Sequence, residues 1–359
     1  MESLGLNLFS ELYHGRRVLL TGHTGFKGSW LALWLKMLGA KVTGLSLAPG
    51  SSPNHWDLLQ MGMQSHFLDI RDVSAIKDTI KAVQPEIMFH LAAQSLVRGS
   101  YNDPLRTWET NVMGTANLLE ICREVPELKA IVIVTSDKCY ENRERLKGYS
   151  ENDPLGGYDP YSASKAGAEL VAASYRNSFY SEPNMPLLAT ARAGNVIGGG
   201  DWSENRLIPD LVRAIENKEI LEIRSPDSIR PWQHVLESLS GYLMLGQKLL
   251  EGQSEFASAW NFGPDQKANF TVSQVLNGLS EYWTDVSWGV TKASQPHETG
   301  LLFLDSSKAN NTLRWKPVLN FKETLMMTAD WYKEYQKTGS VISLQQLVQY
   351  SEKLAAISE

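Results

Sequence analysis

The chain contains 359 residues, of which 43% are hydrophobic and 21% are charged, and its formal net charge is -6. This length predicts about two domains, and the apolar fraction excludes global disorder. An acidic chain without a block of lysine and arginine is a poor candidate for a dedicated nucleic-acid-binding protein.

Neither a secretory signal nor a membrane span is expected. Residues 1–14 mix acidic and amide side chains with leucines, so they lack a basic start and an uninterrupted apolar segment. The apolar stretch Trp30–Leu38 is interrupted by Lys36 and is far shorter than the roughly 20 residues that cross a bilayer. Two cysteines, Cys122 and Cys139, are too few for a disulfide framework and fit a reducing compartment. The cytoplasm is therefore the expected location.

Strand-like and helix-like patterns alternate in the first half of the chain. The expected strands are continuous apolar runs, as in parallel sheets that helices cover on both faces. They span Arg17–Thr21, Lys41–Leu47, Ile87–Leu91 and Ala130–Thr135, and the helices between them span Ser29–Leu38, Ser74–Val83 and about Thr110–Glu124. This alternation predicts an α/β fold with a Rossmann-type doubly wound parallel sheet.

The texture of the sequence changes after about residue 192. Glycines gather in Gly194–Asp201, and prolines then separate shorter elements. We predict a dinucleotide-binding Rossmann domain over residues 1–192 and a smaller, mixed substrate domain over residues 193–359. The boundary is soft, because the helix-like run Val235–Leu250 and its neighbours, near residues 233–263, could return to the first domain.

A glycine-rich turn follows the first expected strand. It reads Thr21-Gly22-His23-Thr24-Gly25-Phe26-Lys27-Gly28 and leads into a helix. Glycines let backbone N–H groups approach a pyrophosphate, and the helix N-terminus adds partial positive charge, which Lys27 would supplement. His23 stands where GxGxxG has its second glycine, so the spacing is instead the TGxxGxxG of short-chain dehydrogenase/reductase proteins.

The adenosine side of such a site is less clearly marked. Residues 43–49, at the end of the second strand, contain neither the carboxylate that holds an NAD ribose nor an arginine for an NADP phosphate. The choice between NAD and NADP is therefore open locally. Asp69, after an expected third strand, either reaches an adenine amino group or caps a helix.

Tyr161 and Lys165 lie four residues apart in an alanine-rich segment, which in a helix places both on one face. An ammonium near a phenol favours the phenolate, so we expect Lys165 to lower the pKa of Tyr161 toward the working pH and make it a base for an alcohol proton. YxxxK alone usually marks a solvated helix face. Behind a glycine turn it indicates alcohol oxidation with a nicotinamide cofactor.

Polar residues follow the strand Ala130–Thr135, at the edge where a doubly wound sheet opens its crevice. Ser136 offers a hydroxyl to the substrate alcohol, and Asp137 offers a general acid if burial raises its pKa. The alternative is a strand exit with ordinary turn residues.

These motifs, Thr21–Gly28, Ser136-Asp137-Lys138, Tyr161–Lys165 and Asn195, resemble the extended short-chain dehydrogenases that act on nucleotide sugars, and within them the sugar-nucleotide 4,6-dehydratases. The resemblance covers Arg17 to about Trp315. It implies NAD as cofactor, no metal, a homo-oligomer (dimer or tetramer) and a nucleotide hexose as substrate. The sequence of Thr21–Trp30 is similar to the corresponding segment of members that use CDP-glucose.

The resemblance also implies a mechanism: oxidation of hexose C4, loss of water across C5 and C6, and return of the hydride to C6. Tyr161 would take the C4 hydroxyl proton, Ser136 would orient that oxygen, Lys165 would hold the cofactor ribose, and Asp137 would protonate the departing C6 hydroxyl. Members that use dTDP-glucose carry a glutamate as C5 base where this chain has Lys138. We hypothesise that Lys138 is the C5 base; the rival view is that it only stabilises the enolate.

Binding residues follow from the same resemblance. Cofactor contacts are expected from Gly22, Thr24, Gly25, Phe26, Lys27, Gly28, Asp69, Ile70, Leu91, Ala92, Tyr161 and Lys165. Substrate contacts are expected from Ser95, Arg98, Asn195, Arg206 and Arg230, with Asn195 and Arg230 at the diphosphate because guanidinium groups match phosphate oxygens.

Further expectations concern single residues and one short segment. Arg192 is expected among the groups that concentrate positive potential near the diphosphates, and Asn111 is expected to position the active-site helix. Among the 11 tryptophans, Trp202 and Trp232 are candidates to stack on a base. Residues 295–298 either close over the nucleotide or form a surface turn.

Two other functions remain open at this point. A nucleotide-sugar 4-epimerase shares C4 oxidation but needs no Asp137-Lys138 pair. A non-enzymatic dinucleotide sensor would not require Tyr161, Lys165 and Ser136 together.

Overall fold

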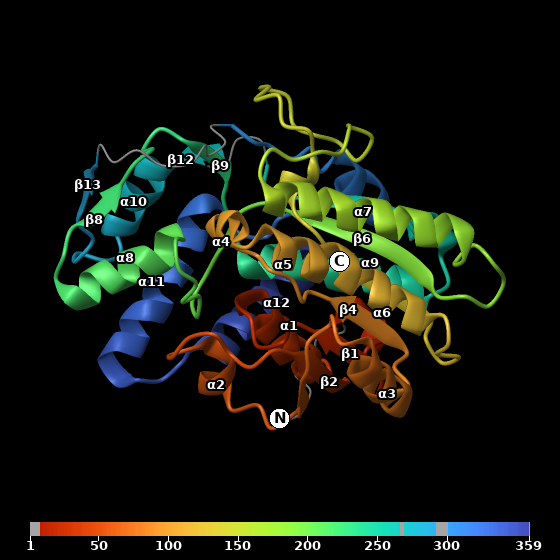
Figure 1. Cartoon of the computed structure of the whole chain (residues 1–359). Helices are drawn as coiled ribbons and strands as arrows, with labels where there is room; N and C mark the ends of the chain where they lie inside the picture. The colour runs from red at the N-terminus through yellow and green to blue at the C-terminus, as the bar shows by residue number, and fades with distance from the viewer. Residues whose placement is uncertain (1–7, 266–268, 292–300, 359) are drawn as a thin grey trace.

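The computed structural model describes residues 8–265, 269–291 and 301–358. Its centre is a parallel sheet, of which β6, β4, β1 and β2 are labelled in Figure 1. The strand order is β11-β6-β5-β4-β1-β2-β3. The strands are β1 (Arg17–Thr21), β2 (Lys41–Ser46), β3 (Gln64–Phe67), β4 (Ile87–His90), β5 (Ala130–Val134), β6 (Leu187–Ala193) and β11 (Ala259–Phe262). The strand order reverses between β1 and β4, the place where doubly wound sheets open a ligand crevice. The predicted Rossmann-type fold is confirmed.

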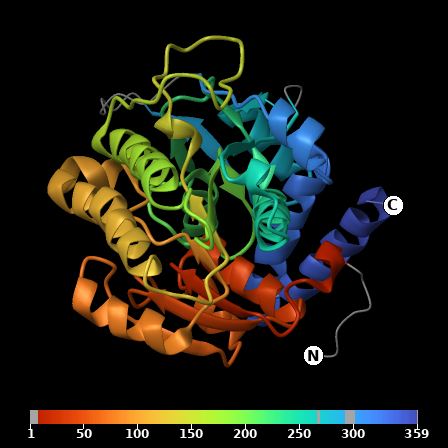
Figure 2. The ribbon, with the colours of Figure 1, turned by 90° about the vertical axis from the view of Figure 1, so that its right-hand side faces the viewer.

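Helices cover both faces of the sheet (Figure 2). One face packs against α3 (Val73–Val83), α6 (Gly114–Cys122) and α7 (Pro160–Ser178), and the other against α1 (Phe26–Met37) and α9 (Val235–Leu250). The C-terminal helix α12 (Ser343–Ser358) packs in turn on α1 and α9. Along β1, Leu19 enters the first core while Val18 and Leu20 enter the second. Alternate strand residues thus point to opposite faces, and both faces are apolar, which explains the continuous hydrophobic runs.

A smaller lobe extends from the carboxyl end of the sheet (Figure 1). It contains α8 (Leu207–Asn217), α10 (Val272–Ser280), α11 (Phe321–Thr338) and three strand pairs: β7 (Val196–Ile197) with β10 (Gln233–His234), β8 (Leu221–Ile223) with β13 (Trp288–Val290), and β9 (Ile229–Pro231) with β12 (Asn269–Thr271). Between these segments the chain returns to the main sheet, because α9 packs on β5 and β6 and β11 pairs with β6.

Short helices complete the crevice side: α2 (His55–Leu59), α4 (Val97–Asn102) and α5 (Pro104–Trp108). The expected helix around Thr110–Glu124 divides into a π-helical turn, η2 (Glu109–Met113), followed by α6. The phosphate-side helix α1 begins at Phe26, earlier than the predicted Ser29, so Lys27 and Gly28 are helical residues.

The tryptophans serve mainly as core residues. Trp30 and Trp34 are fully buried on α1, as helix packing requires. Trp202 is also buried and packs edge-on against Trp331, Tyr332 and Tyr335, so the expectation that it stacks on a nucleotide base is wrong. Cys122 and Cys139 are buried free thiols. Within the described ranges, no helix is long and apolar enough to cross a membrane.

Candidate active site

Two cavities meet at the carboxyl edge of the sheet. The glycine-turn cavity, about 330 Å³, lies over Gly22–Gly28, and the arginine cavity, about 360 Å³, lies between the sheet and the smaller lobe. They share lining residues from both halves of the chain: Lys27, Ser95, Thr135, Tyr161 and Arg206. A group bound in one cavity therefore faces a group bound in the other across Tyr161.

The glycine turn brings backbone very close to backbone. Gly22 has a φ of +76°, and a Cβ there would lie 2.7 Å from the amide nitrogen of Ala92. At Gly28 a Cβ would lie 2.0 Å from the carbonyl oxygen of Gly22, so the first turn of α1 stacks directly on the loop. The open N-terminus of α1 then faces the cavity, a geometry suited to a pyrophosphate.

We predict that Gly28→Ala destabilises the protein by about 1–3 kcal/mol or more, because the methyl group has no space that the rigid backbone can yield. Gly25→Ala is the matched control, since its nearest neighbour, the carbonyl oxygen of Gly22, lies at 3.4 Å. Urea unfolding of both variants measures the difference. Equal stability of the two variants would contradict this reading of the turn.

His23 points away from the cavity. Its Nε2 lies 2.6 Å from Ser65 Oγ, its ring meets Trp56 edge-on, and it fills the space that a side chain at Gly44 would need. Burial lowers the pKa of His23 to about 4, so the ring is neutral near pH 7. The departure from GxGxxG is thus accommodated by Gly44 on β2.

All twelve residues predicted to contact the cofactor line the glycine-turn cavity. Asp69 there accepts hydrogen bonds from the backbone and guanidinium of Arg71, which lower its pKa. The cap of α3 is Asp72, which accepts from Ala75 N, so the helix-cap alternative for Asp69 is wrong. Ser46, Leu47 and Arg106 also line this cavity and were not anticipated, because no motif marks them.

The turn after β5 presents the predicted polar groups. Ser136 accepts from Lys138 N at 3.2 Å and donates to Asp137 Oδ1 at 3.0 Å, which shapes the short helix η3 (Asp137–Cys139). Asp137 Oδ2 is buried without a hydrogen-bond partner, and burial raises the Asp137 pKa although Lys138 opposes this. A protonated Asp137 suits the predicted acid role. Lys138 is half-buried and lines the arginine cavity.

Tyr161 and Lys165 are both buried on α7, a helix that Asp159 caps by accepting from Ser162 N at 2.9 Å. Lys165 Nζ donates to the carbonyl oxygen of Val134 at 3.3 Å, and burial lowers its pKa to about 8. Burial also raises the pKa of Tyr161 to about 12, with hydrogen bonding by Ser136 opposing. The expected lowering of the tyrosine pKa by Lys165 is therefore wrong for the protein without ligands, since desolvation dominates.

Lys27 reaches the junction of the two cavities. Its Nζ donates to the Tyr242 hydroxyl at 3.3 Å, and burial, followed by repulsion from Arg206, lowers its pKa to about 7. Opposite charge on a ligand diphosphate would favour the ammonium form.

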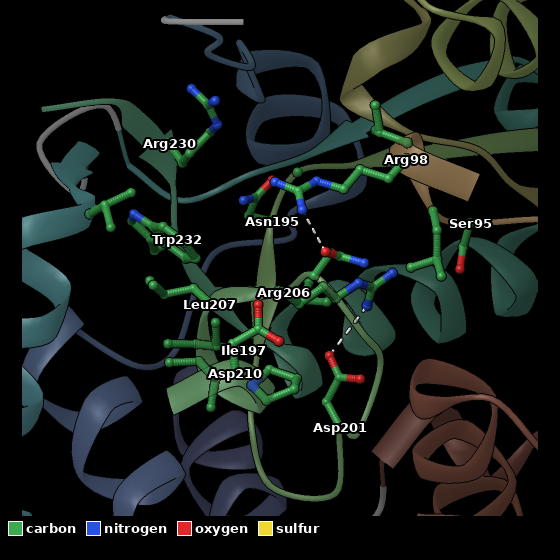
Figure 3. A pocket seen from close by; sticks show the side chains of 18 of the residues that line it. Ser95, Arg98, Asn195, Ile197, Asp201, Arg206, Leu207, Asp210, Arg230 and Trp232 are labelled. Atoms are coloured by element: carbon green, nitrogen blue, oxygen red, sulfur yellow. Dashed lines mark hydrogen bonds and ion pairs between the residues drawn. The ribbon is translucent and has the colours of Figure 1, made fainter. Parts of the chain in front are cut away.

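The arginine cavity contains all five residues predicted to contact the substrate. Arg98 and Arg206 lie on one side of Asn195, and Arg230 lies on the opposite side of it (Figure 3). Arg206 pairs with Asp201 at 3.3 Å, and Arg98 donates to Asn205 Oδ1 at 2.6 Å. Trp232 also lines the cavity, as do residues near β8 that no motif announced: Glu222, Arg224, Ser225 and Ser228.

Arg192 does not line either cavity. It is buried against Glu169, so its expected place near the diphosphates is wrong. Asn111 donates to Ser164 Oγ at 2.8 Å and thereby holds α7, in keeping with its expected positioning role. The segment 295–298 lies outside the described residues. In the part of the chain that the structure describes, no group of three or more His, Cys, Asp or Glu side chains is placed to hold a metal ion.

The doubly wound sheet, the glycine turn and the Tyr161/Lys165 pair define a short-chain dehydrogenase/reductase. A family model described as GDP-mannose 4,6 dehydratase matches residues 19–328, so the chain belongs to this family. Among curated relatives, it is 49% identical to the CDP-glucose 4,6-dehydratase of Salmonella typhimurium, over 90% of this chain and 92% of that protein. It is 25% identical to the dTDP-glucose 4,6-dehydratase of the same organism, over 88% and 92%.

Solved structures agree on the fold. The epimerase Mth375 from Methanothermobacter thermautotrophicus superposes with a TM-score of 0.80 at 24% identity, covering 92% of this chain and 96% of that one. The dTDP-glucose 4,6-dehydratase from Bacillus anthracis, solved in complex with NAD, gives 0.73 at 21% identity, covering 89% and 97%.

Proposed function

We propose that this protein is a CDP-glucose 4,6-dehydratase that converts CDP-glucose to CDP-4-keto-6-deoxyglucose and water with NAD as resident cofactor. The observation that carries the proposal is that Tyr161 lines both cavities with Ser136 and Asp137 in the arginine cavity, in a chain 49% identical to a CDP-glucose 4,6-dehydratase. Bound NAD supplies a hydride acceptor for C4 and a donor for C6, so there is no net redox change.

Each side chain has one task in this scheme. Tyr161 takes the proton of the C4 hydroxyl, and Ser136, next to it, orients that oxygen. The C4 ketone acidifies the C5 hydrogen, which leaves as a proton, and Asp137 protonates the C6 hydroxyl so that it departs as water. The burial that raises the pKa of Asp137, and so favours the protonated acid, also excludes competing water.

Lys138 is the proposed C5 base. It lines the arginine cavity directly after the proposed acid, and this supports a position beside the hexose. A neutral lysine is required, and its pKa must then fall by about three units, or about 4 kcal/mol. A negatively charged Asp137 would oppose this fall in the pKa of Lys138, whereas a protonated Asp137 would not.

The experiment that tests the function offers CDP-, dTDP-, GDP- and UDP-hexoses to the purified protein with NAD and follows the 4-ketosugar. We expect conversion of CDP-glucose. Conversion of dTDP-glucose alone would refute the substrate, and C4 epimerisation without loss of water would favour the 4-epimerase, which the pair Asp137-Lys138 argues against.

Arg230 is proposed as a ligand of the diphosphate. It is 7% exposed and lines the arginine cavity. Because hydrogen bonds to charged groups are worth about 1.5–3 kcal/mol, we predict that Arg230→Met raises KM for CDP-glucose about 10- to 100-fold with little change in kcat. Steady-state kinetics against Arg314→Met, an exposed arginine outside the cavity, provide the check. An unchanged KM would remove Arg230 from the binding site.

The proposed function also implies a division into domains, an oligomeric state and a cellular location. Residues 1–192, with residues near 233–263, would form the NAD-binding domain, and the remainder would bind the nucleotide sugar. A homo-oligomer, dimer or tetramer, is supported by exposed apolar side chains on α5, η2 and α7, namely Leu105, Trp108, Met113 and Leu170. Light scattering that finds only monomer would reject it.

A cytoplasmic location fits the buried free cysteines, and the ketosugar would serve deoxy- or dideoxyhexose synthesis for surface polysaccharides.

A further inference from the structure

A buried ion pair lies behind the active site. Glu169 on α7 and Arg192 on β6 are each 3% exposed, and Arg192 Nη2 lies 2.7 Å from Glu169 Oε2. The same carboxylate accepts from the hydroxyls of Thr135 and Thr190. Neither member of the pair lines the glycine-turn cavity or the arginine cavity, so the pair would act on the reaction through its neighbours.

The neighbours of the pair enclose the catalytic turn. Thr135, bound by Glu169, immediately precedes Ser136. Tyr140, whose hydroxyl accepts from Arg192 Nη1 at 2.8 Å, follows η3, and it donates in turn to Asn261 Oδ1 on β11 at 2.7 Å. The segment Ser136–Cys139 is therefore fastened at both ends to one ion pair.

The pair also fixes the helix that carries the proposed base. Glu169 follows Lys165 by one helical turn and Tyr161 by two, so all three share the face of α7 that meets the sheet. Its bonds to Thr135 and to Thr190 and Arg192 tie that face to the end of β5 and to β6.

Charge adds to this geometry. Burial lowers the pKa of Lys165, and Glu169 is the largest influence that opposes it, followed by Cys139 on η3. The other titratable groups near Lys165 are Tyr161 on α7, Lys27 on α1 and His90 on β4, and burial lowers the pKa values of the last two. Glu169 is thus the principal anion that favours a charged Lys165.

We propose that the Glu169–Arg192 pair is a positioning device for C4 oxidation: it aligns Tyr161 and Lys165 with Ser136 and Asp137 and holds the Glu169 carboxylate one helical turn from Lys165. The inference rests on the proposed function. Glu169 and Arg192 are positioning residues, because they touch neither ligand cavity.

The test compares Glu169→Gln with Thr190→Val, which removes one hydrogen bond from the same carboxylate but leaves its charge. In Glu169→Gln we expect kcat to fall about 10- to 100-fold, as misplaced reacting groups require, with KM for CDP-glucose nearly unchanged. The alkaline limb of the kcat/KM profile should move about one unit to lower pH, because Lys165 loses its proton sooner. In Thr190→Val the limb should stay in place.

A double variant, Glu169→Gln/Arg192→Met, guards against misfolding, since it leaves no uncompensated buried charge. If it melts like the wild type and still has the lowered kcat and the shifted limb, the proposal is supported. A folded double variant with wild-type kcat and an unmoved limb overturns it.

A readout without turnover separates this inference from the proposed function. Competitive acetylation with acetic anhydride, followed by peptide mass spectrometry, measures the apparent pKa of Lys165 in each variant. We expect it to be about one unit lower in Glu169→Gln than in the wild type. An unchanged Lys165 value overturns the positioning role, whereas failure of the wild type to form any 4-ketosugar overturns the proposed function alone.

Discussion

Tyr161→Phe should lower kcat for CDP-glucose about 10²- to 10⁴-fold, the usual contribution of a general base. The phenol stands at the junction of the two cavities, so its loss removes the proton acceptor for the C4 hydroxyl without altering the walls that hold either ligand. Stopped-flow absorbance of the reduced cofactor should then show no transient. Tyr158→Phe, at a tyrosine that is 78% exposed three residues earlier, is the control and should behave as wild type.

The pH dependence of the same step has a definite sign. The base is the deprotonated phenol, and burial places the pKa of Tyr161 at about 12. The active fraction of Tyr161 therefore rises with pH through neutrality. A rate of C4 oxidation that falls as pH rises from acid to neutral would exclude Tyr161 as the base.

Lys138→Met should leave C4 oxidation intact but slow elimination about 10²- to 10⁴-fold if Lys138 is the C5 base. In deuterated water the wild type should incorporate solvent deuterium at C5, and the variant should lose this wash-in while the reduced cofactor still appears. Lys147→Met, at an exposed lysine outside both cavities, provides the control.

The outcome of that experiment separates two roles for one ammonium group. Undiminished wash-in with slower turnover would reject Lys138 as the base and leave it the electrostatic role toward the enolate. The half-buried position beside Asp137 is compatible with proton transfer only if the carboxyl is neutral at that step.

The elements and motifs that were predicted correctly depend on short-range patterns in the sequence. The strand Arg17–Thr21 and the helix Val235–Leu250 were predicted with the bounds that the structure has, because their apolar periods are strong and their ends are marked. The start of α1 was placed too late, since Gly28 in its first turn is a poor helix former. The glycine turn and the Tyr161/Lys165 spacing predicted both sides of the cavity junction.

The features that were not predicted depend on contacts between residues far apart in the sequence. Arg192 was expected near phosphates because its chemistry suits them, yet its direction out of β6 and the approach of Glu169 on α7 turn it into the core. The pKa of Tyr161 depends on how completely the surrounding lobe excludes water, which no spacing of Tyr161 and Lys165 encodes. Glu222 and Arg224 line the arginine cavity from β8 and the residue after it, and β8 pairs with the distant β13.

The pairing of β11 with β6 bears on how the chain is made. During synthesis the first 192 residues emerge with β6 as an open edge and with the apolar face that α9 later covers exposed to water. An unpaired edge beside bare hydrophobic surface is a template for misassociation. Asn261, which anchors Tyr140, also arrives with β11. The dinucleotide half therefore gains its last edge strand, and its catalytic turn gains the Tyr140–Asn261 hydrogen bond, only after residue 262 has been made.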